Sequence, residues 1–241
     1  WANKIIHDEK IKSMVAEIIG PNYYCWNSLI FFKKPRSKNF VSMHQDQNYW
    51  GIENDKALTV SLALTDSNIK NGCIKLLPKS HLKKFEHKDF FSMHNMLARG
   101  QSVFLKKELS DQLYNVELKS GECCIFHGNI VHGSGVNNSD NVRLLYSMRF
   151  LTTDNKVNEK LYYKEATLIS GVDNYNFFKK EPTFANSNIK ILRKKHKQIL
   201  IEQFSKYLYL KTKSNILTKI LMIFFKIDIF RSLIYLIIKK T

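Results

Sequence analysis

The first nineteen residues carry apolar side chains at helical spacing. In Trp1–Ile19 the apolar positions recur every three or four residues and can form one face. Gly20-Pro21 follows, and proline cannot continue a helix because it lacks the amide hydrogen. The sequence therefore predicts one N-terminal helix with an apolar side.

From Tyr23 onward the pattern changes to short runs that are rich in β-branched and aromatic residues, with turn-forming residues between them. Leu82–Gly100 has no sustained period, and we interpret it as a loop that can hold a short helix. Frequent short strands favour a mainly β sandwich or jelly-roll barrel over a parallel α/β sheet. The predicted strands are Tyr23–Phe32, Phe40–His44, Ala57–Leu64, Gly72–Leu77, Gln101–Leu105, Leu113–Leu118, Glu122–Phe126 and Asn141–Leu151.

The pattern becomes helical and lysine-rich near residue 188. We predict a barrel domain over residues 1–187 and a basic amphipathic helical tail over residues 188–241. The tail holds thirteen Lys and Arg residues against two acids, which is +11 of the formal net charge of +17. Ile216–Ile238 is apolar but contains four charged residues, and each central charge costs roughly 2.5–3.5 kcal/mol on insertion into a bilayer. We therefore do not expect the tail to span a membrane.

Two partners for this tail remain open. A helix that lies in the headgroup plane of an anionic membrane tolerates lysines, because their side chains reach back to water. A helix that packs its apolar side on the barrel or on a second copy explains the same pattern. Nucleic acid is disfavoured, because no nucleic-acid-binding motif accompanies the charge. The sequence does not indicate an oligomeric state.

Length, charge and cysteines narrow the class of protein. A chain of 241 residues can form one barrel domain with a small appendage. The net charge of +17 predicts attraction to anionic molecules or surfaces. The four cysteines do not suggest a disulfide scaffold, so we expect reduced thiols and a cytoplasmic location, with the tail able to place the protein at a membrane surface. The chain starts at Trp1, so a leading segment is expected to be missing.

Three side chains form a candidate metal site. His44 and Asp46 are two residues apart at the end of a predicted strand, where alternate side chains share a face. His132 ends a later apolar run and precedes three small residues, Gly133-Ser134-Gly135, that leave room beside a metal. Two imidazoles and one carboxylate on one face of an octahedron are typical of a non-haem ferrous site with three open positions.

An arginine beyond the second histidine suits a dicarboxylate. Arg143 lies on a predicted barrel strand, where a buried cation requires an anion. The distal carboxylate of 2-oxoglutarate can accept two parallel hydrogen bonds from a guanidinium, and Ser134 can add a hydroxyl donor. We predict that Arg143 and Ser134 contact 2-oxoglutarate. Arg149 shares the face of Arg143, but the sequence assigns it no role.

The same segments resemble the phytanoyl-CoA dioxygenase family. The resemblance covers roughly Tyr23 to Leu151, in the family's order, through the segments His44–Trp50 (H-Q-D-Q-N-Y-W), Asn71–His81 (N-G-C-I-K-L-L-P-K-S-H) and Gly121–Arg143.

The resemblance implies a double-stranded β-helix, Fe(II) as cofactor, and 2-oxoglutarate and O2 as cosubstrates. It also implies that His44, Asp46 and His132 hold the iron, that Arg143 and Ser134 bind the cosubstrate, and that Trp50 lines the substrate pocket. Ser61 departs from the family pattern, which has a tryptophan there. A longer segment that would precede Trp1 is a second departure, and the basic tail lies outside the pattern.

The predicted function is hydroxylation of a C–H bond in a small metabolite that is anionic or lipid-linked. The alternatives are a cupin-like metal-binding barrel without oxygenase activity and a membrane-associating module with a vestigial barrel. Two minor expectations concern charged side chains outside this site. We expect Lys33 to lie in a solvated basic loop, and His87 to face solvent.

Overall fold

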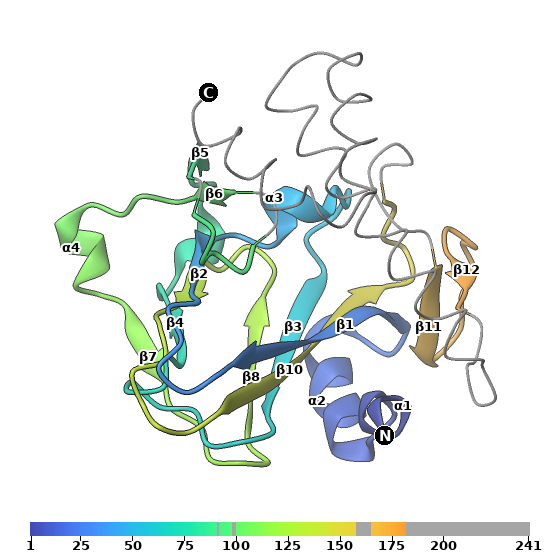
Figure 1. Cartoon of the computed structure of the whole chain (residues 1–241). Coiled ribbons are helices and arrows are strands. Elements are labelled where there is room, and N and C mark those ends of the chain that lie inside the picture. The colour runs from blue at the N-terminus through green and yellow to red at the C-terminus, as the bar shows by residue number, and fades with distance from the viewer. Residues whose placement is uncertain (91, 98–99, 158–164, 182–241) are drawn as a thin grey trace, which may run out of the picture. The chain divides into compact units, whose positions relative to one another are not determined.

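The computed structural model describes residues 1–90, 92–97, 100–157 and 165–181 (Figure 1). Of these, residues 1–88 and 102–181 form one compact unit, which contains every candidate site residue, and residues 89–101 belong to another. The predicted tail and the boundary before it lie outside the described residues. Within the described part of the chain, no helix is long and apolar enough to cross a bilayer.

Most of the structure is β-strand. The helices are α1 (Ala2–Ile6), α2 (Glu9–Ile19), α3 (Gln47–Trp50), α4 (Lys107–Ser110) and the 3-10 turn η1 (Ser80–Leu82). The strands are β1 (Tyr23–Lys33), β2 (Val41–His44), β3 (Ala57–Ala63), β4 (Ile74–Leu76), β5 (Lys88–Asp89), β6 (Gln101–Ser102), β7 (Tyr114–Val116), β8 (Cys123–His127), β9 (His132–Ser134), β10 (Arg143–Thr152), β11 (Glu165–Ser170) and β12 (Lys179–Lys180).

Two sheets form the barrel (Figure 1). The six-stranded sheet has the order β12-β11-β1-β10-β3-β8, and the four-stranded sheet has the order β2-β9-β4-β7. Apolar side chains of both sheets meet between them, among them Leu145 of β10, Ala63 of β3 and Ile74 of β4. The predicted mainly β fold is confirmed. The sequence does not predict β5, β9, β11 and β12. Of these, β5, β9 and β12 have only two or three residues, which is too short to show a period.

The prediction of one N-terminal helix is wrong, because Asp8 starts a second one. Its carboxylate accepts hydrogen bonds from the amides of Lys10 (3.0 Å) and Ile11 (3.4 Å), the geometry of a helix N-cap. The apolar side chains of both helices, such as Ile6 and Val15, pack with Met148 on the outer face of the six-stranded sheet.

A β-bulge in β1 decides which side chains of that strand enter the barrel. The pairing of β1 with β10 shifts by one residue between Cys25 and Asn27. Cys25 packs with the outer cluster, whereas after the shift Asn27 lies opposite Arg149 and Lys33 lies opposite Arg143. One extra residue exchanges the two faces of a strand. The bulge therefore turns Lys33 into the barrel.

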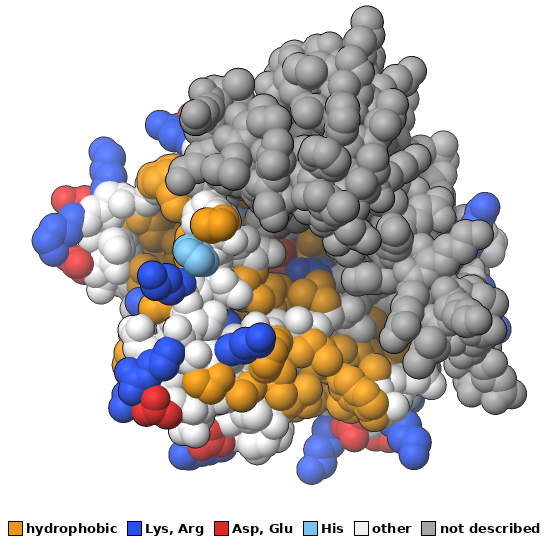
Figure 2. Space-filling model, viewed as in Figure 1, with side chains coloured by type: hydrophobic (Ala, Val, Ile, Leu, Met, Phe, Trp, Pro, Cys, Tyr) orange, Lys and Arg blue, Asp and Glu red, His pale blue; other side chains and the backbone are white. Residues whose placement is uncertain are grey.

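The outer face of β1 beyond the bulge stays partly open to solvent. Ile30 and Phe32 point outward there and are 43% and 42% exposed. Figure 2 shows hydrophobic side chains gathered on this side of the molecule, over the region of β1 and β10. The helices α1 and α2 thus cover only part of the outer face of the sheet.

Gly133 permits the close approach of β9 to β2. A methyl group on Gly133 would lie 2.7 Å from the sulfur of Met43 and 2.8 Å from the carbonyl oxygen of Val41. Gly133→Ala is therefore expected to lower the free energy of unfolding by about 1–3 kcal/mol, as overpacking does, in urea denaturation. Gly135→Ala is the matched control, because a methyl group there meets no atom within 4 Å. Equal stability of the two variants would contradict this account.

Candidate active site

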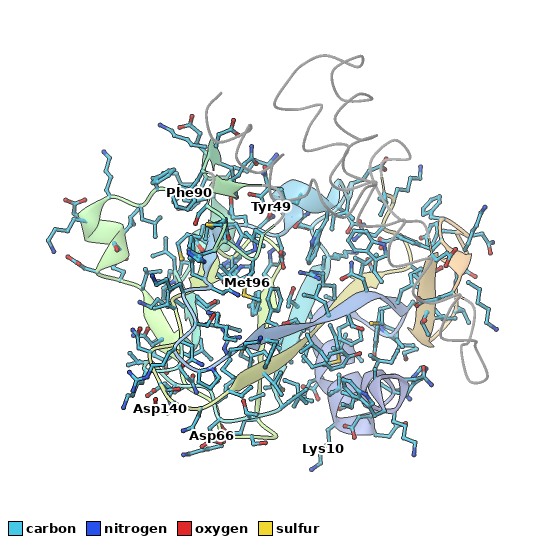
Figure 3. The ribbon with its side chains drawn as sticks, in the orientation of Figure 1. Lys10, Tyr49, Asp66, Phe90, Met96 and Asp140 are labelled. Carbon is cyan, nitrogen blue, oxygen red and sulfur yellow. The ribbon has the colours of Figure 1, made fainter. Side chains whose placement is uncertain are left out.

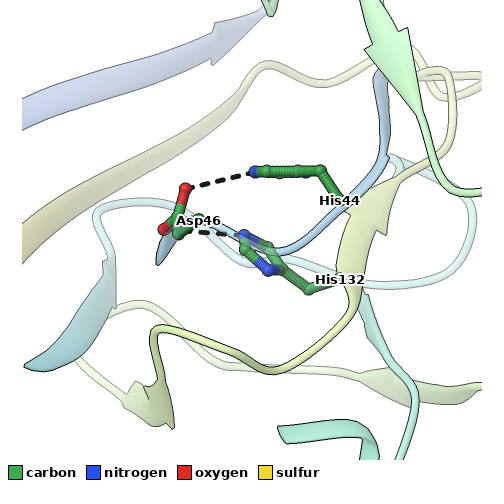
Figure 4. A group of neighbouring side chains, drawn as sticks. All are labelled: His44, Asp46 and His132. Carbon is green, nitrogen blue, oxygen red and sulfur yellow. Dashed lines mark hydrogen bonds and ion pairs between the residues drawn. The ribbon is translucent and has the colours of Figure 1, made fainter. Parts of the chain in front are cut away.

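His44, Asp46 and His132 converge in the barrel as predicted (Figure 4). Their ligand atoms all lie within 4.8 Å of one another, and all three residues are buried. His44 ends β2 and pairs directly with His132 of β9 in the four-stranded sheet. Asp46 is not on the strand. It has helical backbone angles at the start of α3, so a turn of the chain, rather than strand alternation, brings its carboxylate to the imidazoles.

Backbone carbonyls orient both imidazoles. Nδ1 of His44 lies 2.8 Å from the carbonyl oxygen of Ser42, and Nδ1 of His132 lies 3.0 Å from that of Ile130. Since a carbonyl oxygen only accepts, each Nδ1 carries a proton, and in a neutral imidazole Nε2 is then the nitrogen whose lone pair can bind a metal. A hydrogen bond at the outer nitrogen is the usual support of a metal-bound histidine.

The Nε2 atoms face the carboxylate of Asp46. Nε2 of His44 lies 3.2 Å from Oδ1, and Nε2 of His132 lies 3.9 Å from Oδ2. A lone pair that faces a carboxylate oxygen is unfavourable unless a proton or a metal ion lies between them. Burial and, to a lesser extent, the neighbouring His44 together lower the pKa of His132 to about 3, so this imidazole stays neutral and able to bind a metal.

Asp46 stays ionised in spite of its burial. Burial by itself raises its pKa, but the charge of Arg149 and the contacts with the two histidines outweigh this effect and hold that pKa well below its usual range. Oδ2 also accepts a hydrogen bond from the hydroxyl of Thr59 at 3.2 Å. Two neutral nitrogens and one anionic oxygen thus fit a divalent ion such as Fe(II).

Arg143 and Ser134 also lie together. The Arg143 guanidinium is 1% exposed and donates from Nη2 to the carbonyl oxygen of Gly72 (2.7 Å) and to Ser134 Oγ (3.4 Å). Its Nε is buried, and no described residue accepts a hydrogen bond from it. An arginine that is buried with an unused donor is expected to bind an anion.

Lys33 joins this group, so the prediction of a solvated Lys33 is wrong. Its side chain is fully buried, and its ammonium donates to Ser134 Oγ (2.6 Å) and to the carbonyl oxygens of Gly72 (3.3 Å) and Gly135. Lys33 and Arg143 are cross-strand neighbours, and like charges in this position repel. Among the described residues, no acidic side chain forms a salt bridge with either cation.

Burial changes the acidity of both cations. It lowers the pKa of Arg143 to about 10, and burial together with the charge of Arg143 lowers the pKa of Lys33 to about 6. The unfolded chain therefore binds a proton that the folded chain lacks between about pH 6 and pH 10.5. Stability without a bound anion should rise with pH across this window.

Lys33→Met is expected to stabilise the protein at pH 6 and to lose this advantage as the pH approaches 10, because the variant has no buried amine to deprotonate. Urea denaturation between pH 6 and pH 9.5 measures the difference in slope. The exposed neighbour Lys34, changed to Met, is the control. If the free energies of unfolding of Lys33→Met and of the unsubstituted protein changed with pH in parallel, the lowered pKa of a buried Lys33 would be refuted.

The structure also places Trp50, Ser61 and His87, which the sequence analysis singled out. Trp50 is buried on α3, and its ring lies against Arg149, 5.5 Å from the guanidinium carbon. Ser61, where the family pattern has tryptophan, is buried, and its Oγ lies 2.7 Å from Ser147 Oγ. The prediction that His87 faces solvent is wrong. Its Nε2 accepts a hydrogen bond from the amide of Gln45, and its ring packs on Tyr49 at 5.3 Å.

The structure is similar to known non-haem oxygenases. The ThoJ non-heme monooxygenase matches with a TM-score of 0.70 and 23% identity, over 86% of this chain and 76% of that chain. Apo EctD from S. alaskensis matches with a TM-score of 0.53 and 18% identity, over 75% of this chain and 60% of that one. These similarities confirm the double-stranded β-helix fold.

Sequence comparison identifies the family. Phytanoyl-CoA dioxygenase domain-containing protein 1 of Danio rerio is 24% identical over 156 residues, which is 64% of this chain and 54% of the relative. A probable alpha-ketoglutarate-dependent hypophosphite dioxygenase of Stutzerimonas stutzeri is 30% identical over 140 residues, 57% of this chain and 48% of the relative. The chain thus spans about half the length of these relatives. The family model for phytanoyl-CoA dioxygenase matches residues 2–145, and the chain therefore belongs to the phytanoyl-CoA dioxygenase (PhyH) family.

Proposed function

We propose that this protein is an Fe(II)- and 2-oxoglutarate-dependent dioxygenase that hydroxylates a C–H bond of a small metabolite. Membership of the family supports the class of reaction. The observation that carries the proposal is the presence of two complementary groups in one barrel. One is a neutral-imidazole and carboxylate set for a divalent metal, and the other is a buried pair of cations with no acidic partner among the described residues.

His44, His132 and Asp46 would hold the iron. Their donors occupy one side of the ion and leave coordination positions for the cosubstrate and oxygen. The bound iron, with 2-oxoglutarate, supplies oxygen activation and the removal of hydrogen from a C–H bond. Because the three side chains are buried, the barrel limits the access of water to this chemistry.

Arg143 and Lys33 would bind the distal carboxylate of 2-oxoglutarate. Ser134 Oγ already accepts hydrogen bonds from both cations, so its own hydrogen is free to be donated to that carboxylate. The carboxylate would cancel the repulsion between the two cations, and it would provide an acceptor for Nε of Arg143. These contacts would hold 2-oxoglutarate by its distal carboxylate and leave the 2-oxo acid group at the other end for the metal.

Anaerobic addition of Fe(II) and 2-oxoglutarate tests this function. The proposed enzyme should develop a weak visible charge-transfer band that requires both components. Formation of succinate from 2-oxoglutarate, across a panel of candidate substrates, would then show turnover. A metal-binding barrel without oxygenase activity would bind Fe(II) but develop no band that depends on 2-oxoglutarate. That result would reject the proposal.

A further inference from the structure

Arg149 lies beside the candidate metal site but is not one of its ligands. It is on the inward face of β10, six residues beyond Arg143, and its side chain is 11% exposed. Nε of Arg149 lies 3.7 Å from Oδ2 of Asp46. This distance allows charge attraction but is too long for a hydrogen bond.

Among the described residues, the side chain of Arg149 has one hydrogen-bond acceptor. Nη1 donates to Oδ1 of Asn27 at 2.7 Å, whereas Nε is buried and finds no acceptor among the described residues. A guanidinium has five N–H donors, and an arginine held in place with free donors is typical of a site for carboxylate or phosphate.

The surroundings fix the plane of this guanidinium. The ring of Trp50 lies over it at 5.5 Å, and Trp26 packs edge-on against Trp50 at 5.9 Å. Asn27, at the position where the bulge of β1 turns it inward, accepts the hydrogen bond from Nη1. The guanidinium of Arg149 is therefore held beside aromatic rings. This arrangement suits a ligand that carries an anionic group on an apolar part.

The balance of charge also requires an anion. A divalent metal is offset in part by Asp46, and the two carboxylates of 2-oxoglutarate offset the remaining metal charge and one of the two cations at Arg143 and Lys33. Although Arg149 lies 3.7 Å from Asp46, one positive charge then remains unbalanced in the site, even when Lys33 is neutral. Because burial of an unbalanced charge is unfavourable, the loaded site is incomplete without one more negative group.

We propose that Arg149 binds an oxyanion of the substrate, a carboxylate or a phosphorus oxyanion, and so selects anionic substrates and places their C–H bonds beside the metal. This inference rests on the proposed function, because it assumes that the metal and 2-oxoglutarate occupy the rest of the site. Arg149 is a specificity-determining residue in this view.

The experiment measures binding rather than turnover. The full chain is loaded with Zn(II) in place of iron and with N-oxalylglycine, a non-reacting analogue of 2-oxoglutarate. Calorimetry then gives the affinities of benzoate, phenylphosphonate and benzamide, which share an aromatic body, although only the first two carry an oxyanion. The unsubstituted protein should bind at least one of the two anions on the order of 30-fold more tightly than benzamide.

Arg149→Gln should abolish this preference, while the affinities for Zn(II) and N-oxalylglycine change much less. Arg149→Lys keeps a charge beside Asp46 without the fork and should retain part of the preference. Arg36→Gln is the matched control, because Arg36 is exposed and pairs with Asp140. It should behave as the unsubstituted protein does.

Three results would overturn the inference. The unsubstituted protein could show no preference for anions, or Arg149→Gln could keep that preference because the anions bind the metal directly. Arg149→Gln could also lose Zn(II) affinity with no change in anion preference, which would make Arg149 a positioning residue for Asp46. If the unsubstituted protein failed to bind Zn(II) and N-oxalylglycine, the proposed function would fall together with the inference.

Discussion

Replacement of Asp46 by alanine is expected to abolish succinate formation and the charge-transfer band together. Among the described residues, Asp46 supplies the only anionic oxygen of the candidate metal site, and it also faces Arg149. Loss of a residue that merely supports a metal ligand costs roughly 10–100-fold in affinity or activity, so loss of the ligand itself should exceed 100-fold. Titration with Fe(II) under anaerobic conditions, followed by a succinate assay, measures both effects.

Asp140→Ala is the control for this change. Asp140 is exposed and pairs with Arg36, and it lies at the edge of the molecule away from Tyr49 of α3 (Figure 3). The control should leave iron binding unchanged. Turnover by Asp46→Ala at the rate of the unsubstituted protein would show that this carboxylate is no ligand.

Replacement of Arg143 by glutamine is expected to raise the KM for 2-oxoglutarate by at least about 30-fold. Truncation of one partner in a buried, hydrogen-bonded charge pair costs roughly 2–5 kcal/mol. The change should act on KM more than on kcat, because Arg143 would hold the end of the cosubstrate away from the reacting atoms. Steady-state kinetics with varied 2-oxoglutarate separates the two constants.

The structure also predicts how stability responds to Arg143→Gln. Without a bound anion, the charge of Arg143 is buried with no acidic partner among the described residues, so the substitution removes an unfavourable buried charge. The variant should therefore keep the thermal stability of the unsubstituted protein but gain much less from added N-oxalylglycine. A variant that responded fully to N-oxalylglycine would place the cosubstrate elsewhere.

The sequence predicts the parts of the site that depend on short, local signals. His44 and Asp46 are neighbours in the chain, and His132 is followed by Gly133 and Ser134, where small residues let two strands approach. His44 ends a predicted strand, whereas Asp46 lies on a turn and β9, which carries His132, is too short to show alternation. Arg143 could be recognised because an arginine within a buried strand needs an anion.

The inward position of Lys33 and the contact of Arg149 with Asn27 could not be predicted, because both depend on one extra residue in β1. Strand alternation assigns inward and outward faces only as long as the register is constant. The bulge before Asn27 exchanges the faces of β1 and carries Lys33 inward beside Arg143. It also brings Asn27 opposite Arg149, and no residue pattern near Trp26 signals this change.

The hydrogen bonds from the two imidazoles to main-chain carbonyls have a consequence for divergence within the family. The acceptors are the backbone oxygens of Ser42 and Ile130, which every amino acid supplies. Mutation of the side chains at these two positions therefore cannot remove the groups that aim the imidazoles. The orientation of the two histidines can therefore be kept while neighbouring side chains are substituted. The residues that line the substrate pocket can then change around the same metal site.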